Sequence, residues 1–204
     1  MKLKVGSDID GVLAGFWSEY VKRFGVTPDN IITKNCENVL KYDKEFWTTL
    51  PLLRRPDFEF TLYCTKRVNP KSYIKEWIIK NNLPNVPIYR QICQCASKAP
   101  MIKGRVDVFI EDSVFNFLDL NKKGIPCLLM DTPENKDWGP IGRIYSLNYD
   151  EDTIFNILKK FNESFRMGMY LLALEKNYDN ISFRINRVNK KINIIRKEQF
   201  LEAY

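Results

Sequence analysis

Short apolar runs alternate along the chain with longer segments whose apolar residues recur at helical spacing. The apolar runs predict five strands, over residues 2–7, 58–64, 87–93, 106–110 and 125–130. The helical spacing predicts helices over residues 16–24, 70–80, 97–103 and 115–123, with weaker patches over 31–40 and 44–50. Strands that alternate with helices of this length are typical of a parallel sheet with helices on both faces. We therefore predict an α/β fold with a Rossmann-like sheet.

The first two predicted strands are separated by residues 16–50, a segment that is too long for a simple loop. We predict a small helical insert over 16–50, placed within a core that is formed by residues 1–15 and 51–153. Residues 154–204 follow the core as a C-terminal helical extension.

Heptad-like spacing distinguishes this extension. Its apolar residues recur at steps of three and four, with Gly168 in one position of the series: Ile154, Leu158, Phe161, Phe165, Gly168 and Leu172, then Ile181, Ile185, Val188, Ile192 and Ile195. Such spacing predicts two helices, which either form a hairpin against the core or pair with a second chain. Residues 159–204 hold ten Lys or Arg and five Asp or Glu, so the extension is basic. Its basic residues are either simply solvated or bind anions. We expect the helix over 181–204 to mediate self-association or to contact nucleic acid.

The composition, with 45% hydrophobic and 28% charged residues, is that of an ordinary soluble protein. No segment approaches the ~20 apolar residues that span a bilayer, and the first residues lack the apolar region of a signal peptide. Five cysteines at irregular spacing argue against a disulfide framework. We expect a cytoplasmic protein with no membrane association, and its frequent Asn, Lys and Ile indicate an AT-rich bacterial or viral genome. The chain has no histidine, which excludes Ser-His-Asp and Cys-His catalysis.

Two aspartates, Asp8 and Asp10, end the first predicted strand and are followed at once by Gly11. Taken alone, this stretch is either a solvated turn or a site that binds a divalent cation or attacks phosphorus. In open parallel sheets, ligands bind beyond the carboxyl ends of the strands. The strand ends at this edge supply further polar residues: Thr65, Lys98, Glu111 and Asp112. This convergence favours a functional site.

Carboxylates, a hydroxyl and a lysine together suit phosphoryl transfer assisted by Mg2+. One aspartate attacks phosphorus, while Mg2+ offsets the repulsion between carboxylate and phosphate. A second aspartate protonates the leaving oxygen and later activates water, and the hydroxyl and lysine bind the phosphate oxygens.

The order of these residues resembles the haloacid dehalogenase (HAD-like) superfamily of phosphatases. The Asp-x-Asp-Gly-[Val/Thr]-Leu motif of that superfamily is similar to residues 8–13. Its second motif, an apolar strand ending in Thr or Ser, is similar to residues 62–65, and its acidic fourth motif is similar to residues 108–113. The resemblance covers about residues 3–158.

The resemblance implies roles for the acidic residues. Asp8 would be the nucleophile, and Asp10 would be the general acid and base. Mg2+ would be held by the carboxylates of Asp8 and Asp112 and by the backbone carbonyl of Asp10. The fourth motif has Glu111 where the superfamily more commonly has Asp, so Glu111 is a further candidate ligand.

The resemblance also implies a phosphate-binding set. Thr65 corresponds to the hydroxyl of the second motif. The lysine of the third motif corresponds best to Lys98, with Lys103 as the alternative. Lys66 and Arg67, which directly follow Thr65, are further candidates.

Within the superfamily, the chain is most similar to the 5'(3')-deoxyribonucleotidases. Their first motif continues as Gly-Val-Leu-Ala-Asp-Phe, whereas this chain has Gly15 in place of the acid. The resemblance makes the helical insert a small cap over the active site and implies nucleoside monophosphates as substrates. Three aromatic residues of the insert, Phe16, Trp17 and Tyr20, either stack on a base or belong to the core.

We therefore expect a Mg2+-dependent phosphomonoesterase that forms an aspartyl-phosphate and acts as a 5'(3')-(deoxy)ribonucleotidase. One alternative is a polynucleotide 3'-phosphatase that acts on nucleic acid ends, which the basic extension would suit. Another is a catalytically silent HAD-like binding or structural module that uses the basic helical tail.

Overall fold

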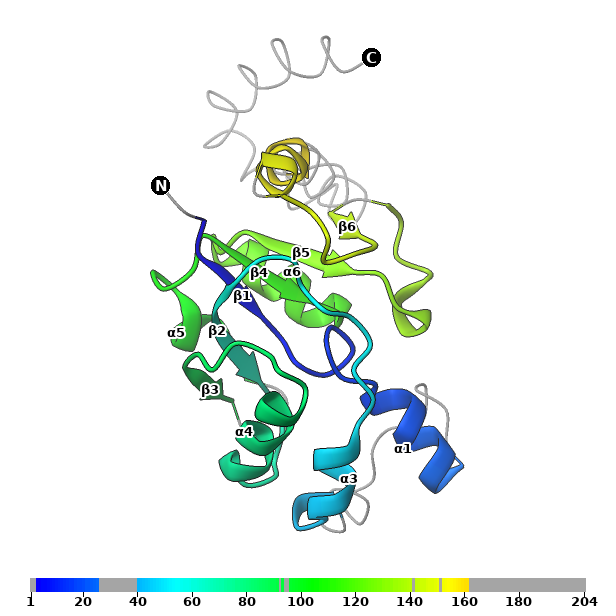
Figure 1. The fold of residues 1–204 in the computed structure, drawn as a ribbon. Coiled ribbons are helices and arrows are strands. Elements are labelled where there is room, and N and C mark those ends of the chain that lie inside the picture. The colour runs from blue at the N-terminus through cyan, green and yellow to red at the C-terminus, as the bar shows by residue number, and fades with distance from the viewer. Residues whose placement is uncertain are drawn as a thin grey trace, which may run out of the picture. The chain divides into compact units, whose positions relative to one another are not determined.

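The centre of the molecule is a six-stranded, all-parallel sheet with the strand order β3-β2-β1-β4-β5-β6 (Figure 1). The computed structural model describes residues 3–25, 40–91, 93, 96–140, 142–150 and 152–161. The strands are β1 (Val5–Ser7), β2 (Phe60–Thr65), β3 (Ile88–Arg90), β4 (Val108–Glu111), β5 (Cys127–Met130) and β6 (Arg143–Ile144). The predicted α/β class with a parallel sheet is confirmed.

Local sequence signals determine where the helices begin and end. The helices are α1 (Phe16–Phe24), α3 (Lys44–Thr49), α4 (Lys71–Lys80), α5 (Ala99–Ile102) and α6 (Val114–Lys122). Gly25 ends α1 in a left-handed conformation with φ 64°. The Asp43 carboxylate caps α3 by accepting a 2.8 Å hydrogen bond from the Phe46 N–H. Ser113 caps α6 in the same way.

The strand order places the predicted site at one edge of the sheet. Because every strand runs in the same direction, the carboxyl ends of β1, β2 and β4 meet at that edge. The order reverses after β3, so right-handed crossovers put α4 on one face and α5 and α6 on the other. Figure 1 shows α1 and α3 beyond the carboxyl ends of the central strands.

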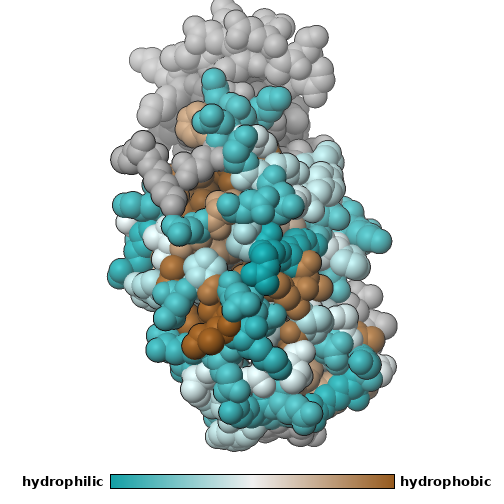
Figure 2. Space-filling model, in the orientation of Figure 1, coloured by the Kyte–Doolittle hydropathy of each residue, from teal (hydrophilic) through white to brown (hydrophobic). Residues whose placement is uncertain are grey.

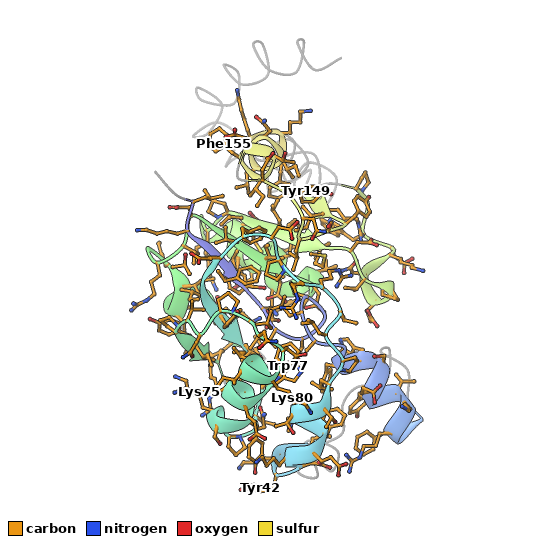
Figure 3. All side chains as sticks on the ribbon, in the orientation of Figure 1. Tyr42, Lys75, Trp77, Lys80, Tyr149 and Phe155 are labelled. Atoms are coloured by element: carbon orange, nitrogen blue, oxygen red, sulfur yellow. The ribbon has the colours of Figure 1, made fainter. Side chains whose placement is uncertain are left out.

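Burial on both faces makes the central strands almost wholly inaccessible to solvent. All residues of β1, β4 and β5 are buried, as expected for a parallel sheet covered by helices. On α4, Trp77 faces the core whereas Lys75 points away from it (Figure 3). The Trp77 Nε1–H donates to the Leu50 carbonyl at 2.8 Å and so joins α4 to the segment that follows α3.

Aromatic rings pack the described part of the helical insert. The ring of Phe16 stacks on that of Trp47 at 5.5 Å and on that of Tyr20 at 5.5 Å. The start of α1 also approaches the chain closely at Gly15, where an added Cβ would lie 2.8 Å from Pro51 Cγ. This close approach is a packing reason for glycine at the position where the resembled family has an acid.

Three elements near the end of the described chain extend the core. The sequence did not predict β6 or the short 3-10 helix η1 (Pro133–Asn135), because two or three residues are too few to show periodicity. A helix over 152–161 buries Ile154 and Leu158, and its Phe161 ring lies 5.4 Å from that of Phe117. Phe155 of the same helix is 60% exposed (Figure 3).

Figure 2 shows one face of the molecule, on which apolar residues form separate patches among hydrophilic ones. Among the described residues, no helix is both long enough and apolar enough to cross a membrane. The first of the two helices predicted in the extension begins at Ile154, within the described residues, whereas the rest of it and the whole second helix lie outside them. The self-association or nucleic-acid contact expected of 181–204 and most of the helical patch over 31–40 also lie outside them.

Candidate active site

The end of β1 places Asp8 beside the end of β4. Ser7, the last residue of β1, pairs with Tyr63 of β2 and with Ile110 of β4. The Asp8 N–H continues the ladder by donating to the Ile110 carbonyl at 2.8 Å. Asp8 therefore lies next to Glu111, the residue that follows Ile110, although the two are far apart in sequence.

Lys98 joins these two acids. Its Nζ lies 2.7 Å from Asp8 Oδ2 and 2.7 Å from Glu111 Oε2, and the side chain is fully buried. Burial alone would lower the pKa of Lys98, but the charges of Asp8 and Glu111 raise it above its ordinary value. The ammonium is therefore retained. Lys103, the alternative candidate, is exposed at the end of α5 and does not line the pocket described below.

Glu111 accepts hydrogen bonds at both carboxylate oxygens. Oε2 accepts from Lys98, and Oε1 accepts from the backbone N–H groups of Asp112 and Ser113, each at 3.2 Å. Burial would raise the pKa of Glu111, but the charge and hydrogen bond of Lys98 lower it below its usual value. Glu111 is therefore an ionised acceptor that orients Lys98 and the start of α6.

Three carboxylates at this edge could hold a metal ion. Asp8, Glu111 and Asp112 each offer an oxygen, and these oxygens all lie within 4.8 Å of one another. Burial and then the charge of Glu111 raise the pKa values of Asp8 and Asp112 well above the usual range. A bound cation would stabilise their ionised forms, and a donor set made only of oxygen suits a hard divalent ion. Both oxygens of Glu111 are already engaged, and so are those of Asp8, whose Oδ1 accepts a 2.7 Å hydrogen bond from the Ile9 N–H and whose Oδ2 pairs with Lys98.

Gly11 accommodates Asp112 across the site. Its φ is 74°, and an added Cβ would lie only 1.9 Å from Asp112 Oδ2. The carboxylate of Asp112 thus occupies the space that a side chain at residue 11 would fill. This contact gives a physical reason for glycine directly after the two aspartates.

Asp10 forms a two-point ion pair with Arg67. Arg67 Nη2 lies 2.7 Å from Asp10 Oδ1, and Nε lies 3.0 Å and 2.9 Å from the two carboxylate oxygens. The guanidinium lies over the rings of Trp47 and Trp77, at 4.9 Å and 5.6 Å from their centroids. Its Nη1 is buried and has no hydrogen-bond partner in the described part of the chain.

The acids and Arg67, but not the fully buried Lys98, line a pocket of about 250 Å³. Its polar part contains carboxylates of the site, and its apolar part contains aromatic rings of the insert. The lining residues that the sequence singled out are Asp8, Asp10, Phe16, Trp17, Lys66, Arg67, Glu111 and Asp112. Trp47, Phe115 and Asn116 also line it. Phe16 and Trp17 therefore line the pocket, although Phe16, like Tyr20, is a buried core residue.

Thr65 and Lys66 lie at the end of β2 and differ in exposure to the pocket. Thr65 is wholly buried, its Oγ1 accepts a 3.2 Å hydrogen bond from the Arg67 N–H, and it does not line the pocket. Lys66 lines the pocket, with its Nζ 5.7 Å from the ring centroid of Phe115. Burial, followed by repulsion from Lys98, lowers the pKa of Lys66.

Three residues that the sequence did not single out, Arg54, Asn135 and Arg143, form hydrogen bonds that hold the backbone of the site in place. The Arg54 guanidinium donates to the carbonyls of Gly11 at 2.9 Å and of Asp131 at 2.7 Å, which ties the loop after β1 to the end of β5. The Asn135 amide donates to the Asp112 carbonyl at 2.8 Å, and Arg143 in turn donates to Asn135. No local pattern marks these residues, because their partners are brought together only by the sheet.

Comparison with known proteins adds no family assignment. No protein-family model matches the chain, and no curated protein matches it significantly.

Proposed function

We propose that the protein is a Mg2+-dependent phosphomonoesterase that forms an aspartyl-phosphate on Asp8. The supporting observation is the arrangement of Asp8, with Lys98 bonded to its carboxylate, Asp112 beside it, and Asp10 two residues away in the same pocket. The net reaction converts a phosphomonoester and water into an alcohol and orthophosphate. Asp8 and Asp112 would hold the ion, and the backbone carbonyl of Asp10 is a third candidate ligand. When bound, Mg2+ would offset the negative charge that carboxylates and phosphate bring together.

In the first half-reaction, a carboxylate oxygen of Asp8 forms a bond to phosphorus and the bond from phosphorus to the ester oxygen breaks. Asp10 gives its proton to that departing oxygen, so the leaving group is released as an alcohol. Lys98 holds Asp8 by its ammonium and keeps a positive charge near the transferred group.

In the second half-reaction, the Asp10 carboxylate takes a proton from water as the water oxygen attacks phosphorus. The bond between phosphorus and Asp8 then breaks, which releases orthophosphate and restores the Asp8 carboxylate. The proton taken from water returns Asp10 to the acid form that the next cycle requires.

Nucleoside monophosphates are the substrates that we propose. Phe16, Trp17 and Trp47 supply aromatic surface in the same pocket as the carboxylates. A planar base could stack on Trp17, the partly exposed ring of the three, while the phosphate lies at Asp8. Phe16 and Trp47 already stack on each other, and Arg67 lies over the ring of Trp47. This pairing of an aromatic region with an acidic, cation-binding region favours a nucleotide over a small alkyl phosphate.

Phosphate release from a panel of 5'- and 3'-nucleotides, measured with and without Mg2+, tests the proposal. We expect Mg2+-dependent release by the wild type and its loss in Asp8→Asn. In Asp10→Asn we expect a decrease of ~10²–10⁴-fold in turnover. Asp57→Asn is the matched control, because Asp57 is exposed and does not line the pocket, and it should retain wild-type activity. Absence of release from every nucleotide, with no effect of Asp8→Asn, would favour the silent binding module.

A polynucleotide 3'-phosphatase is the second candidate, and residues at the pocket favour it. Phe115 lines the pocket yet is 63% exposed, and Lys66 Nζ lies near its ring. An exposed ring beside a cation is typical of surfaces that bind single-stranded nucleic acid. Release of phosphate from 3'-phosphorylated oligonucleotides, but not from mononucleotides, would establish this activity in place of the first.

A further inference from the structure

We propose that Arg67 is a positioning residue for Asp10 and that it sets how well Asp10 protonates the leaving oxygen. The inference rests on the proposed function, because it assigns Asp10 the proton-transfer role. It gives a specific role to Arg67, which the sequence singled out only as a candidate phosphate ligand.

The contact between the two side chains fixes the carboxylate at two points. Arg67 uses both Nε and Nη2 toward Asp10, with distances of 2.7 to 3.0 Å. A forked guanidinium holds both the position and the plane of a carboxylate, whereas a lysine ammonium acts as a point charge. With Arg67 in this arrangement, Asp10 cannot rotate freely about its side-chain bonds.

The guanidinium is itself held in place by two tryptophan rings. The Arg67 side chain is 1% exposed, and its guanidinium lies over Trp47 at 4.9 Å and Trp77 at 5.6 Å. Each ring is tied by its Nε1–H to a backbone carbonyl, Trp47 to that of Leu40 at 2.6 Å and Trp77 to that of Leu50 at 2.8 Å. The orientation of Asp10 is therefore determined by the helical insert and by α4, as well as by the loop after β1.

The backbone of the same residue supports this geometry. The Arg67 N–H donates to Thr65 Oγ1 at 3.2 Å, which fixes the turn that leads out of β2. Among the ion pairs of the described residues, Arg67 pairs with Asp10, whereas Lys98 pairs with Asp8 and Glu111. Asp10 is therefore held by a different cation from Asp8. The nucleophile and the proton donor thus have different cationic partners.

This separation has a chemical consequence. An alkoxide needs a proton to depart from phosphorus, and a carboxylic acid must lie within hydrogen-bond reach to supply it. A nitrophenolate departs without protonation, so its release does not depend on where Asp10 lies. Loss of the two-point contact between Arg67 and Asp10 should therefore slow the cleavage of a nucleotide far more than the cleavage of p-nitrophenyl phosphate.

The kinetic test compares kcat/KM for a nucleoside monophosphate and for p-nitrophenyl phosphate, because this ratio reports steps up to release of the leaving group. In Arg67→Lys we expect the loss for the nucleotide to exceed the loss for p-nitrophenyl phosphate by at least about tenfold. Arg55→Lys is the matched control. Arg55 is exposed, binds the carbonyls of Asn81 and Asn82, and lies outside the pocket lining, so this variant should leave both values unchanged.

An equal loss for both substrates in Arg67→Lys would overturn the inference, since a purely structural role weakens both reactions alike. Unchanged values for both would overturn it as well. A double-mutant cycle of urea unfolding with Arg67→Lys and Asp10→Asn tests the pair without any activity. We expect the double variant to lose no more stability than the more affected single variant, and additive losses would overturn the inference. If the wild type hydrolyses neither substrate, the proposed function fails, and the cycle still decides whether Arg67 holds Asp10.

Discussion

Lys98 Nζ lies 2.7 Å from Glu111 Oε2, and both side chains have no solvent exposure. The pair joins the segment before α5 to the end of β4. Asp8 shares the same ammonium, so the loss of Lys98 would leave two buried carboxylates without their cation.

Glu111→Ala should destabilise the fold. The substitution removes one of the two carboxylates that bind Lys98 and the acceptor of two backbone N–H groups, and a buried donor left unsatisfied costs about 1–3 kcal/mol. Urea unfolding measures the free energy of unfolding. Glu76→Ala is the control, because the Lys44–Glu76 pair is exposed and its loss should hardly change stability. Equal effects of the two substitutions would contradict this account of Glu111.

Gly11→Ala should impair both stability and metal binding. The backbone has φ 74°, and the new Cβ would collide with the Asp112 carboxylate. We expect a loss of more than about 1 kcal/mol in the free energy of unfolding and a weaker stabilisation by Mg2+. Gly25→Ala separates the two causes, because Gly25 has φ 64° but nothing within 4 Å of the added Cβ. Full stabilisation of Gly11→Ala by Mg2+ would show that Asp112 is not displaced.

Mg2+ should stabilise the wild type through Asp8 and Asp112. An ion that binds only the folded state at one hundred times its Kd adds about 2.7 kcal/mol to the free energy of unfolding. A titration of Tm with Mg2+ measures this effect. The rise should be much smaller in Asp112→Asn and unchanged in the exposed control Asp57→Asn. A rise in Asp112→Asn equal to that of the wild type would place the ion elsewhere.

Stability without metal should fall as pH rises above the ordinary pKa range of a carboxyl group. Burial and then the charge of Glu111 raise the pKa values of Asp8 and Asp112, so the folded state keeps protons that the unfolded state has lost. Glu111, whose pKa is lowered, acts in the opposite direction but only below about pH 4.3. Urea unfolding in EDTA, at pH values above the ordinary carboxyl pKa, measures the slope of the free energy of unfolding against pH. Mg2+ should reduce the slope, and stability that rises with pH in EDTA would contradict the prediction.

Local patterns predicted the class of fold and the positions of the acids. Each strand and helix depends largely on the spacing of its own apolar residues, so α1, α4 and α6 were placed to within one or two residues. Parallel strands bring their carboxyl ends to one edge, and the meeting of Asp8 with Lys98 follows from that rule. The roles of these residues in catalysis and in Mg2+ binding remain predictions.

The contacts of Asp10 with Arg67 and of Asp112 with Asn135 could not be predicted in the same way. Arg67 and Asp10 are 57 residues apart, and their contact depends on the pairing of β1 with β2 and on two tryptophan rings from different elements. Asn135 reaches the Asp112 carbonyl from η1, a 3-10 helix that is too short to show a periodic signal. Such contacts are properties of the packed chain and have no signature in either segment.

The sequence by itself determined an α/β chain with two aspartates at the end of its first strand, because periodicity and strand ends are local features. Only the tertiary structure decided which cationic side chain pairs with each acid. Asp8 shares the Lys98 ammonium with Glu111, while Asp10 is held by Arg67. The physical reason is that a buried charge needs an opposite charge within a few ångströms, and the residue that supplies it is selected by strand register and packing.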